Sequence, residues 1–344
     1  MSSLAGLISR LSAATASAAR LPRVLHLGRR LVGCLPFLCL LLILIPWPVV
    51  GATTPTPQAP STPQMPDGSH RLLAAHAAQS HGLTGDPVTW ISQGAYDEDY
   101  CEFEPYPPCW PWIPSGWHSW DPDTDQFWTE PPIWSDFGSG LVRAGQAFDR
   151  AVDAAISGDA QAAHLYLGRA VHLLGDMATP AHVHLDPHLP PFDSDPYELW
   201  LNEQDLANTH AWLAQHPPGP GWDLSFRDLP TWSELNADLR GQLEAASQVY
   251  GGRISGQELW RLGPEGHDVV IFRLMYLMAE EADNWDSGDV QGEQVPGDLG
   301  DPAYLVQMRD ALFPRLVPYS AALIDYFGYR TTSRQLLFLP MVAR

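Results

Sequence analysis

The sequence predicts an all-α protein with one large helical domain and a long aromatic-rich loop region. Several segments carry apolar residues at helical spacing, whereas the alternation of apolar and polar residues that is typical of strands is scarce. The chain has 344 residues, of which 45% are hydrophobic, so a large core can form. We expect the helical domain to occupy residues 67–330.

The first 52 residues indicate a signal peptide or an N-terminal membrane anchor. Arginines precede an apolar run at residues 31–50, and the small residues of a cleavage site follow it. The run is long enough for an anchor, which needs about 20 residues. Its three prolines favour a cleaved signal peptide. In either case we expect the rest of the chain to be extracellular or at the cell surface.

A linker, a helix and a long loop are expected next. Residues 53–66 are rich in proline and threonine, as extended linkers are. A helix is predicted from Ser69 to about His81, capped by Asp67 or by Ser69 itself. Residues 94–136 hold many Trp, Pro, Tyr and Asp residues without a steady period, which indicates a long ordered loop.

Two cysteines, Cys101 and Cys109, flank a proline-rich turn in this loop. In an oxidising compartment such a pair is expected to form a disulfide that closes a short loop. A metal site built on them is less favoured, because two thiols alone make a poor zinc site.

Helical periodicity resumes beyond the loop. A helix is predicted at 138–156, then a turn at 157–159, then a helix that ends near Thr179 because Pro180 follows. Further helices are expected at 196–216, 229–250, 265–285 and 302–327. The apolar tail at residues 331–344 ends in LLFLPMVAR, which predicts either a strand-like docking segment or a sorting signal.

The charge of the chain argues against a nucleic-acid partner. Acidic residues number 40 and basic residues 19, and every basic residue is an arginine. The part of the chain beyond residue 52 contains 14 arginines and all 40 acidic residues, which gives it a net charge of −26. Binding by counterion release from nucleic acid needs the opposite sign of charge.

The most informative motif is LGRAVHLLGDMATPAH, which begins at Leu167. His172 and Asp176 are four residues apart, so on a helix they share one face and can reach one metal ion. His182 lies beyond the predicted helix end, where it can point at a neighbouring ion. Imidazole nitrogen and carboxylate oxygen together suit zinc.

Other candidate ligands occur in the same part of the chain. His70 lies at a predicted helix start, Asp97 and Asp99 lie in GAYDEDY, and His118 lies in GWHSWDPDT. More candidates follow His182: His184, Asp186, His188, Asp193, Asp195 and Glu198.

These segments, in this order, resemble the zinc-dependent phospholipase C family of the phospholipase C/P1 nuclease superfamily. The resemblance covers about residues 67–200 and is carried by YLGRAVHLLGDMATPAH, SHRLLAAHA, GAYDEDY and WHSWDPDT. It implies the all-α fold of that superfamily and a centre of one to three Zn²⁺ ions.

The resemblance also implies a ligand set. Asp99, His118, His172 and Asp176 would hold one zinc. Asp176 would bridge to a second zinc, which also takes His70. His182 and Glu198 would hold a third, and a glutamate at 198 matches the phospholipase branch.

Two positions depart from the family pattern. The family uses an N-terminal Trp on the zinc that His70 shares, and no Trp lies between Ala52 and His70 here. The family also has a His four residues before its Glu, where this chain has Ser194. Asp195, His188 or His184 could replace that ligand.

The implied activity is hydrolysis of a phospholipid or other phosphodiester, at a membrane surface if the substrate is a lipid. Zinc-bound hydroxide would attack phosphorus, with Asp99 as ligand and general base. Asp97 would assist as a hydrogen-bond partner or lie as a solvated loop acid. The tryptophans at 110, 112, 117, 120 and 128 would line a substrate pocket or cover the core.

Two other functions remain open from the sequence. One is a single-strand nuclease of the same superfamily, in which aromatic residues would stack bases. The other is an exported zinc-binding protein whose incomplete ligand set no longer supports catalysis.

Overall fold

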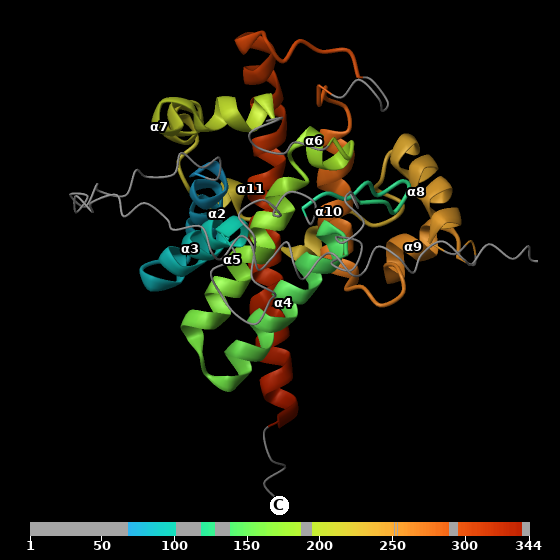
Figure 1. Cartoon of the computed structure of the whole chain (residues 1–344). Coiled ribbons are helices and arrows are strands. Elements are labelled where there is room, and N and C mark those ends of the chain that lie inside the picture. Colours follow the sequence, from blue (N-terminus) through green and yellow to red (C-terminus); the bar gives the residue numbers. More distant parts are fainter. Residues whose placement is uncertain are drawn as a thin grey trace, which may run out of the picture. The chain divides into compact units, whose positions relative to one another are not determined.

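The computed structural model describes most of the compact unit Gln64–Arg344. The described residues are 68–100, 118–127, 138–186, 195–250, 252, 254–288 and 295–338. They form helices and turns and contain no strand, only an isolated bridge between Asp121 and Gln126 (Figure 1). The all-α prediction is confirmed for this part of the chain. The expected signal or anchor, the linker and the cysteine pair lie outside the described residues.

Helices α2 (Gly68–Ser80) and α3 (Asp86–Tyr100) form an N-terminal pair. The expectation of a loop from residue 94 onward is wrong at its start, because residues 94–100 are the last turns of α3. Val88, Ile91 and Ala95 are buried at spacings of three and four, which is the helical period. The acidic and aromatic residues beside them hid this pattern in the sequence.

Helices α4 (Gly140–Ser157) and α5 (Ala160–Asp176) form a hairpin around the predicted turn. The side chains of Ser139 and Asp159 each accept a backbone amide from the first turn of the helix they cap. Gly158 ends α4 with φ 87°, a left-handed conformation that glycine adopts without strain. Local sequence chemistry therefore explains both helix starts and the turn between them.

Helices α3 and α5 cross at two glycines. A Cβ at Gly94 would lie 2.0 Å from the carbonyl oxygen of Leu165, and one at Gly168 would lie 2.2 Å from that of Ile91. Any larger residue would force the two backbones apart. This close crossing brings Ala95 of α3 against the face of α5 that carries the central motif.

Helix α5 ends at Asp176, three residues before the predicted end at Thr179. Thr179 is the N-cap of the short helix α6 (Pro180–Val183), so Pro180 starts a new helix as well as ending the old one. Helix α7 (Pro196–Gln215) follows and begins where the sequence predicts.

The helix expected at 229–250 is shorter than predicted. Two short 3₁₀ helices, η3 (Pro220–Trp222) and η4 (Phe226–Asp228), precede α8 (Ala237–Val249). The Asn236 side chain caps α8 by accepting a backbone amide, which sets this later start.

Three helices complete the described chain. Helix α9 (Gly256–Leu262) was not expected, although its start carries a capping box. Helix α10 (Val269–Ala282) lies inside the predicted segment 265–285. Helix α11 (Pro302–Phe338) runs past the predicted end at 327, so the first part of the tail, residues 331–338, is helical rather than strand-like.

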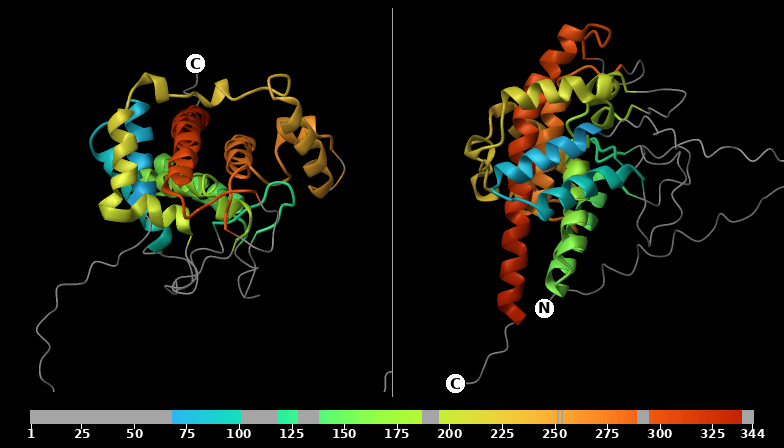
Figure 2. Two further views of the ribbon diagram at one scale, coloured as in Figure 1. Left: turned by 90° about the horizontal axis from the view of Figure 1, so that it is seen from above. Right: turned by 90° about the vertical axis from the view of Figure 1, so that its left-hand side faces the viewer.

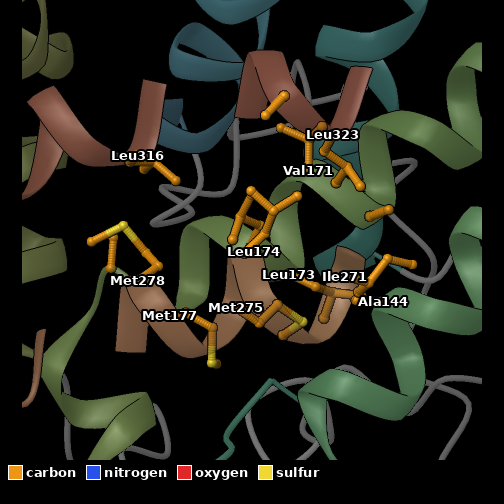
Figure 3. Close-up of a cluster of buried hydrophobic side chains, with 14 of the residues drawn as sticks. Ala144, Val171, Leu173, Leu174, Met177, Ile271, Met275, Met278, Leu316 and Leu323 are labelled. Carbon is orange, nitrogen blue, oxygen red and sulfur yellow. The ribbon is translucent and has the colours of Figure 1, made fainter. Parts of the chain in front are cut away.

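The core is centred on α5, α10 and α11. The left view of Figure 2 shows α11 (red) and α10 (orange) side by side. Helices α2, α3 and α7 lie on the side of α11 that faces away from α10, and helices α8 and α9 lie on the opposite side, next to α10. Buried side chains of the three central helices pack together, among them Leu174, Met275 and Leu316 (Figure 3). Among the described helices, none has the length and apolar character needed to cross a membrane.

Candidate metal centre

Six of the predicted ligands converge at one end of α5. His70 comes from α2, His172 and Asp176 from α5, and the remaining three from separate segments: His118 from 118–127, His182 from α6 and Glu198 from α7. Only Glu198 is more than marginally accessible, with 16% of its side chain exposed. The centre therefore joins residues up to 128 positions apart in sequence in a largely buried cluster.

Asp176 lies at the middle of this cluster. Its carboxylate oxygens lie 3.3 Å from His172 Nε2, 3.2 Å from His118 Nδ1 and 3.6 Å from His70 Nε2. Two of the three distances exceed ordinary hydrogen bonds. The distances to His172 and His118 are close to the roughly 3.3–3.4 Å between two ligand atoms of a tetrahedral zinc whose bonds are about 2.0–2.1 Å long, and the distance to His70 is longer. The donor atoms therefore have types and spacing that could hold a metal ion.

Glu198 extends the cluster. Its Oε1 lies 3.5 Å from His182 Nε2 and 3.6 Å from His70 Nε2. The described residues contain two sets of donors, and within each set the ligand atoms lie within 4.8 Å of one another. One set is His70, His172 and Asp176, and the other is Asp176, His182 and Glu198. Asp176 belongs to both, as expected for a bridging carboxylate. The geometry therefore supports a centre that could hold more than one ion.

The grouping differs in one respect from the sequence-based expectation. His70 was expected on an ion apart from His172, yet their rings lie close, tilted by 34° with centroids 4.4 Å apart. His118 also lies close to His172, with ring centroids at 5.1 Å. The structure brings these residues together, and their assignment to individual ions stays a prediction.

The orientation of His172 is set by α3. Its Nδ1 lies 2.6 Å from the carbonyl oxygen of Ala95. A carbonyl oxygen only accepts, so Nδ1 carries a hydrogen in this contact, and in the neutral ring Nε2 then has the lone pair. Nε2 is the atom that faces Asp176. This is the tautomer that a metal-binding histidine needs.

Gly175 makes room for His70. A Cβ at this position would lie 2.4 Å from His70 Nδ1, so the imidazole packs directly on the α5 backbone. The role of Gly175 was not predicted from the sequence. The glycine next to Asp176 in the motif was a signal for it, because a glycine inside a helix costs stability unless something needs the space.

The segment that carries His118 is held from two sides. The Trp120 amide donates to the carbonyl of His182 at 3.1 Å, and the Gly140 amide donates to Ser119 at 3.1 Å. A Cβ at Gly140 would approach the His118 carbonyl to 2.8 Å. These contacts fix the segment against α6 and against the start of α4.

Burial lowers the pKa of His118 well below its ordinary value of 6.5, and the neighbouring His172, His182, Arg143 and His70 lower it further. A neutral imidazole has a free lone pair, which a metal ligand requires.

Asp195 caps a helix in the structure, and its predicted role as a ligand stays a prediction. Its Oδ1 accepts the amides of Tyr197 and Glu198, at 2.6 and 3.2 Å, and so caps α7. The cap fixes the start of the helix that carries Glu198. His184, the weaker substitute, instead lies 3.1 Å from the carbonyl of Trp285 through its Nε2. Neither residue belongs to the two donor sets found among the described residues.

Several other predicted residues can be placed only in part. Asp99 lies in the last turn of α3, but its side chain, His188 and Ser194 are outside the described residues. Asp97 is buried and accepts the Gln93 amide at 2.5 Å, so its interpretation as a solvated loop acid is wrong. Trp120 is fully buried in the core, whereas the tryptophans at 110, 112, 117 and 128 are outside the described residues.

Comparison with known proteins does not assign this chain to a family. No family model matches the sequence, and no curated protein matches it. Among solved structures, the alpha toxin from Clostridium absonum is similar, with a TM-score of 0.43 and 14% sequence identity. The match covers 79% of this chain and 65% of that chain, so this chain spans less than two thirds of the toxin. The proposed function therefore depends on the residues of the site.

Proposed function

We propose that this chain is an exported zinc-dependent phosphodiester hydrolase of the phospholipase C type. The observation that carries the proposal is the convergence of four histidines on two carboxylates, with N···O distances of 3.2–3.6 Å around Asp176 and Glu198. The order of the motifs that supply these residues supports it.

Zinc bound at this centre would supply a more acidic water and positive charge to stabilise the phosphoryl oxygens. The residues of the chain contribute orientation and exclusion of water. Asp176 and His172 present their donor atoms from one face of α5, and the Ala95 carbonyl accepts from His172 Nδ1, which leaves Nε2 to face Asp176. Asp99 is proposed as the base that orients the attacking water.

Phospholipid is the proposed substrate class. A chain this acidic would repel a polyanionic strand, whereas a phospholipid presents a single phosphodiester at a membrane surface. Glu198 matches the phospholipase branch of the resemblance. Hydrolysis would take place outside the cytoplasm, consistent with the basic and apolar N-terminus.

The test combines metal counting with two activity assays on the full chain. We expect bound zinc, release of a phosphorylated headgroup from phospholipid vesicles, and little cleavage of single-stranded DNA. The variants His172→Ala and Asp176→Ala should lose zinc and lipid hydrolysis together. Asp153→Asn, in an exposed ion pair of α4 with Arg334, is the control and should retain both.

Three results would contradict the proposal. Full activity with zinc retained in His172→Ala would refute the ligand assignment. Cleavage of DNA in place of lipid would identify a nuclease of the same superfamily. Bound zinc without turnover of either substrate would identify a non-catalytic zinc-binding protein, whose ligand set is incomplete for catalysis.

A further inference from the structure

A buried ion-pair network lies one helical turn away from the contact between α3 and His172. Arg143 Nη2 of α4 donates a hydrogen bond to Oε1 of Glu98 on α3 at 2.5 Å. Arg169 Nη1 of α5 forms an ion pair with Glu98 Oε2 at 3.6 Å. All three side chains are buried, with exposures of 2–5%. The adjoining cavity measures about 10 Å³, room for about one water. The network therefore joins three helices where solvent barely reaches.

Sequence spacing connects this network to the metal centre. Glu98 lies three residues after Ala95 on α3, and Arg169 lies three residues before His172 on α5. Residues three apart on a helix are neighbours on its surface. The ion pair between Glu98 and Arg169 therefore spans the same pair of helices as the hydrogen bond between His172 and the Ala95 carbonyl, one turn along each helix.

The close crossing alone does not fix this hydrogen bond. Gly94 and Gly168 set how near α3 and α5 approach, and a glycine has no side chain that could resist sliding of one helix along the other. A buried carboxylate held by two guanidinium groups resists such movement, because any shift leaves a charge without its partner in a medium of low dielectric. The network thus restrains the register in which the Ala95 carbonyl meets Nδ1.

We propose that Glu98, with Arg143 and Arg169, is a positioning residue that holds the Ala95 carbonyl against His172 and so keeps the proton of this histidine on Nδ1. Glu98 acts through the α3 backbone and does not itself touch a metal or a substrate. This inference deepens the proposed function, because it concerns a ligand of the same centre.

The test measures the His172 tautomer in the metal-free full chain by ¹⁵N NMR of its histidine rings, with His172→Gln used to identify the signal. The wild-type ring should hold its hydrogen on Nδ1. In Glu98→Gln, which keeps the shape but removes the charge, a substantial fraction should carry the hydrogen on Nε2. Zinc affinity should fall by about 10–100-fold, as is typical when a group that orients a ligand is lost.

Controls separate positioning from general loosening. Asp153→Asn removes an exposed ion pair from α4 and should leave both the tautomer and zinc affinity at wild-type values. If Glu98→Gln does not fold, Arg169→Lys takes its place, since lysine keeps the charge but loses the planar fork of arginine. In Arg169→Lys we expect a smaller shift of the hydrogen to Nε2 of His172 and a smaller loss of zinc affinity.

An unchanged His172 tautomer in a folded Glu98→Gln or Arg169→Lys chain would overturn the proposal, whatever the zinc affinity. Neither metal nor substrate is present in the NMR measurement. Its result is therefore separate from the outcome of the lipid and DNA assays, and either proposal can fail while the other stands.

Discussion

Glu280 on α10 should make the folded chain less stable as pH rises. Its side chain is 8% exposed. Burial is the main cause that raises its pKa from 4.5 to about 8, and the Asp123 carboxylate adds to the effect. A hydrogen bond with the Tyr276 hydroxyl opposes the shift in part. The folded protein therefore holds this carboxyl in its neutral form at pH values where an unfolded chain ionises it.

The sign and size of the effect follow from proton linkage. Between about pH 4.5 and pH 8 the folded state binds more protons at Glu280 than the unfolded state, so the free energy of unfolding falls as pH rises. The contribution is fully present below pH 4.5 and is lost by the time pH passes about 8. At about 1.4 kcal/mol per pKa unit, the loss amounts to roughly 5 kcal/mol.

The variant Glu280→Gln tests this reasoning, because glutamine resembles the neutral carboxyl at every pH. Urea unfolding of the metal-free protein at pH 5 and at pH 8.5 measures the free energy of unfolding. We expect similar stability at the acidic pH and a variant several kcal/mol more stable than wild type at the alkaline pH. Glu281→Gln, the next residue on α10, is the matched control and should follow the wild-type pH dependence.

One result would refute this account. If Glu280→Gln changed stability by the same amount at both pH values, Glu280 would have to be ionised in the folded chain already at pH 5. Burial would then not raise its pKa, and the carboxyl would have a charge partner or water in contact with it.

Four further variants test three helix glycines and the cap of α7. Gly175→Ala should displace the His70 ring, and zinc counting should show fewer ions or weaker retention in a folded chain; unaltered zinc binding would show that the ring can move at little cost. Gly168→Ala should lower the free energy of unfolding by about 1–3 kcal/mol or more in urea titrations, since its Cβ would strike backbone. Gly145→Ala has open space and should raise it by about 0.5–1 kcal/mol, and equal effects at the two glycines would contradict the crossing. Asp195→Asn should retain zinc, because asparagine caps a helix as well as aspartate does, whereas loss of one zinc equivalent would restore Asp195 as a ligand.

Much of the fold was predictable where the signals are local. The caps of α4 and α5 and the prolines that start α6 and α7 each act over a few residues, and the helices appear close to where those signals place them. Helix α3 was missed because only three apolar side chains mark its buried face. Helix α8 starts later than predicted because an asparagine cap outweighs the apolar residues that precede it.

The sequence alone determined the all-α class and the donor types of the candidate centre, since helical period and ligand chemistry depend on residue identity and short spacing. The tertiary structure decided which donors meet. That His70 lies near Glu198, that Asp195 caps a helix, and that Ala95 and Glu98 of an unexpected helix face α5 all follow from how helices cross. Such crossings depend on packing between residues far apart in the chain, which no local pattern records.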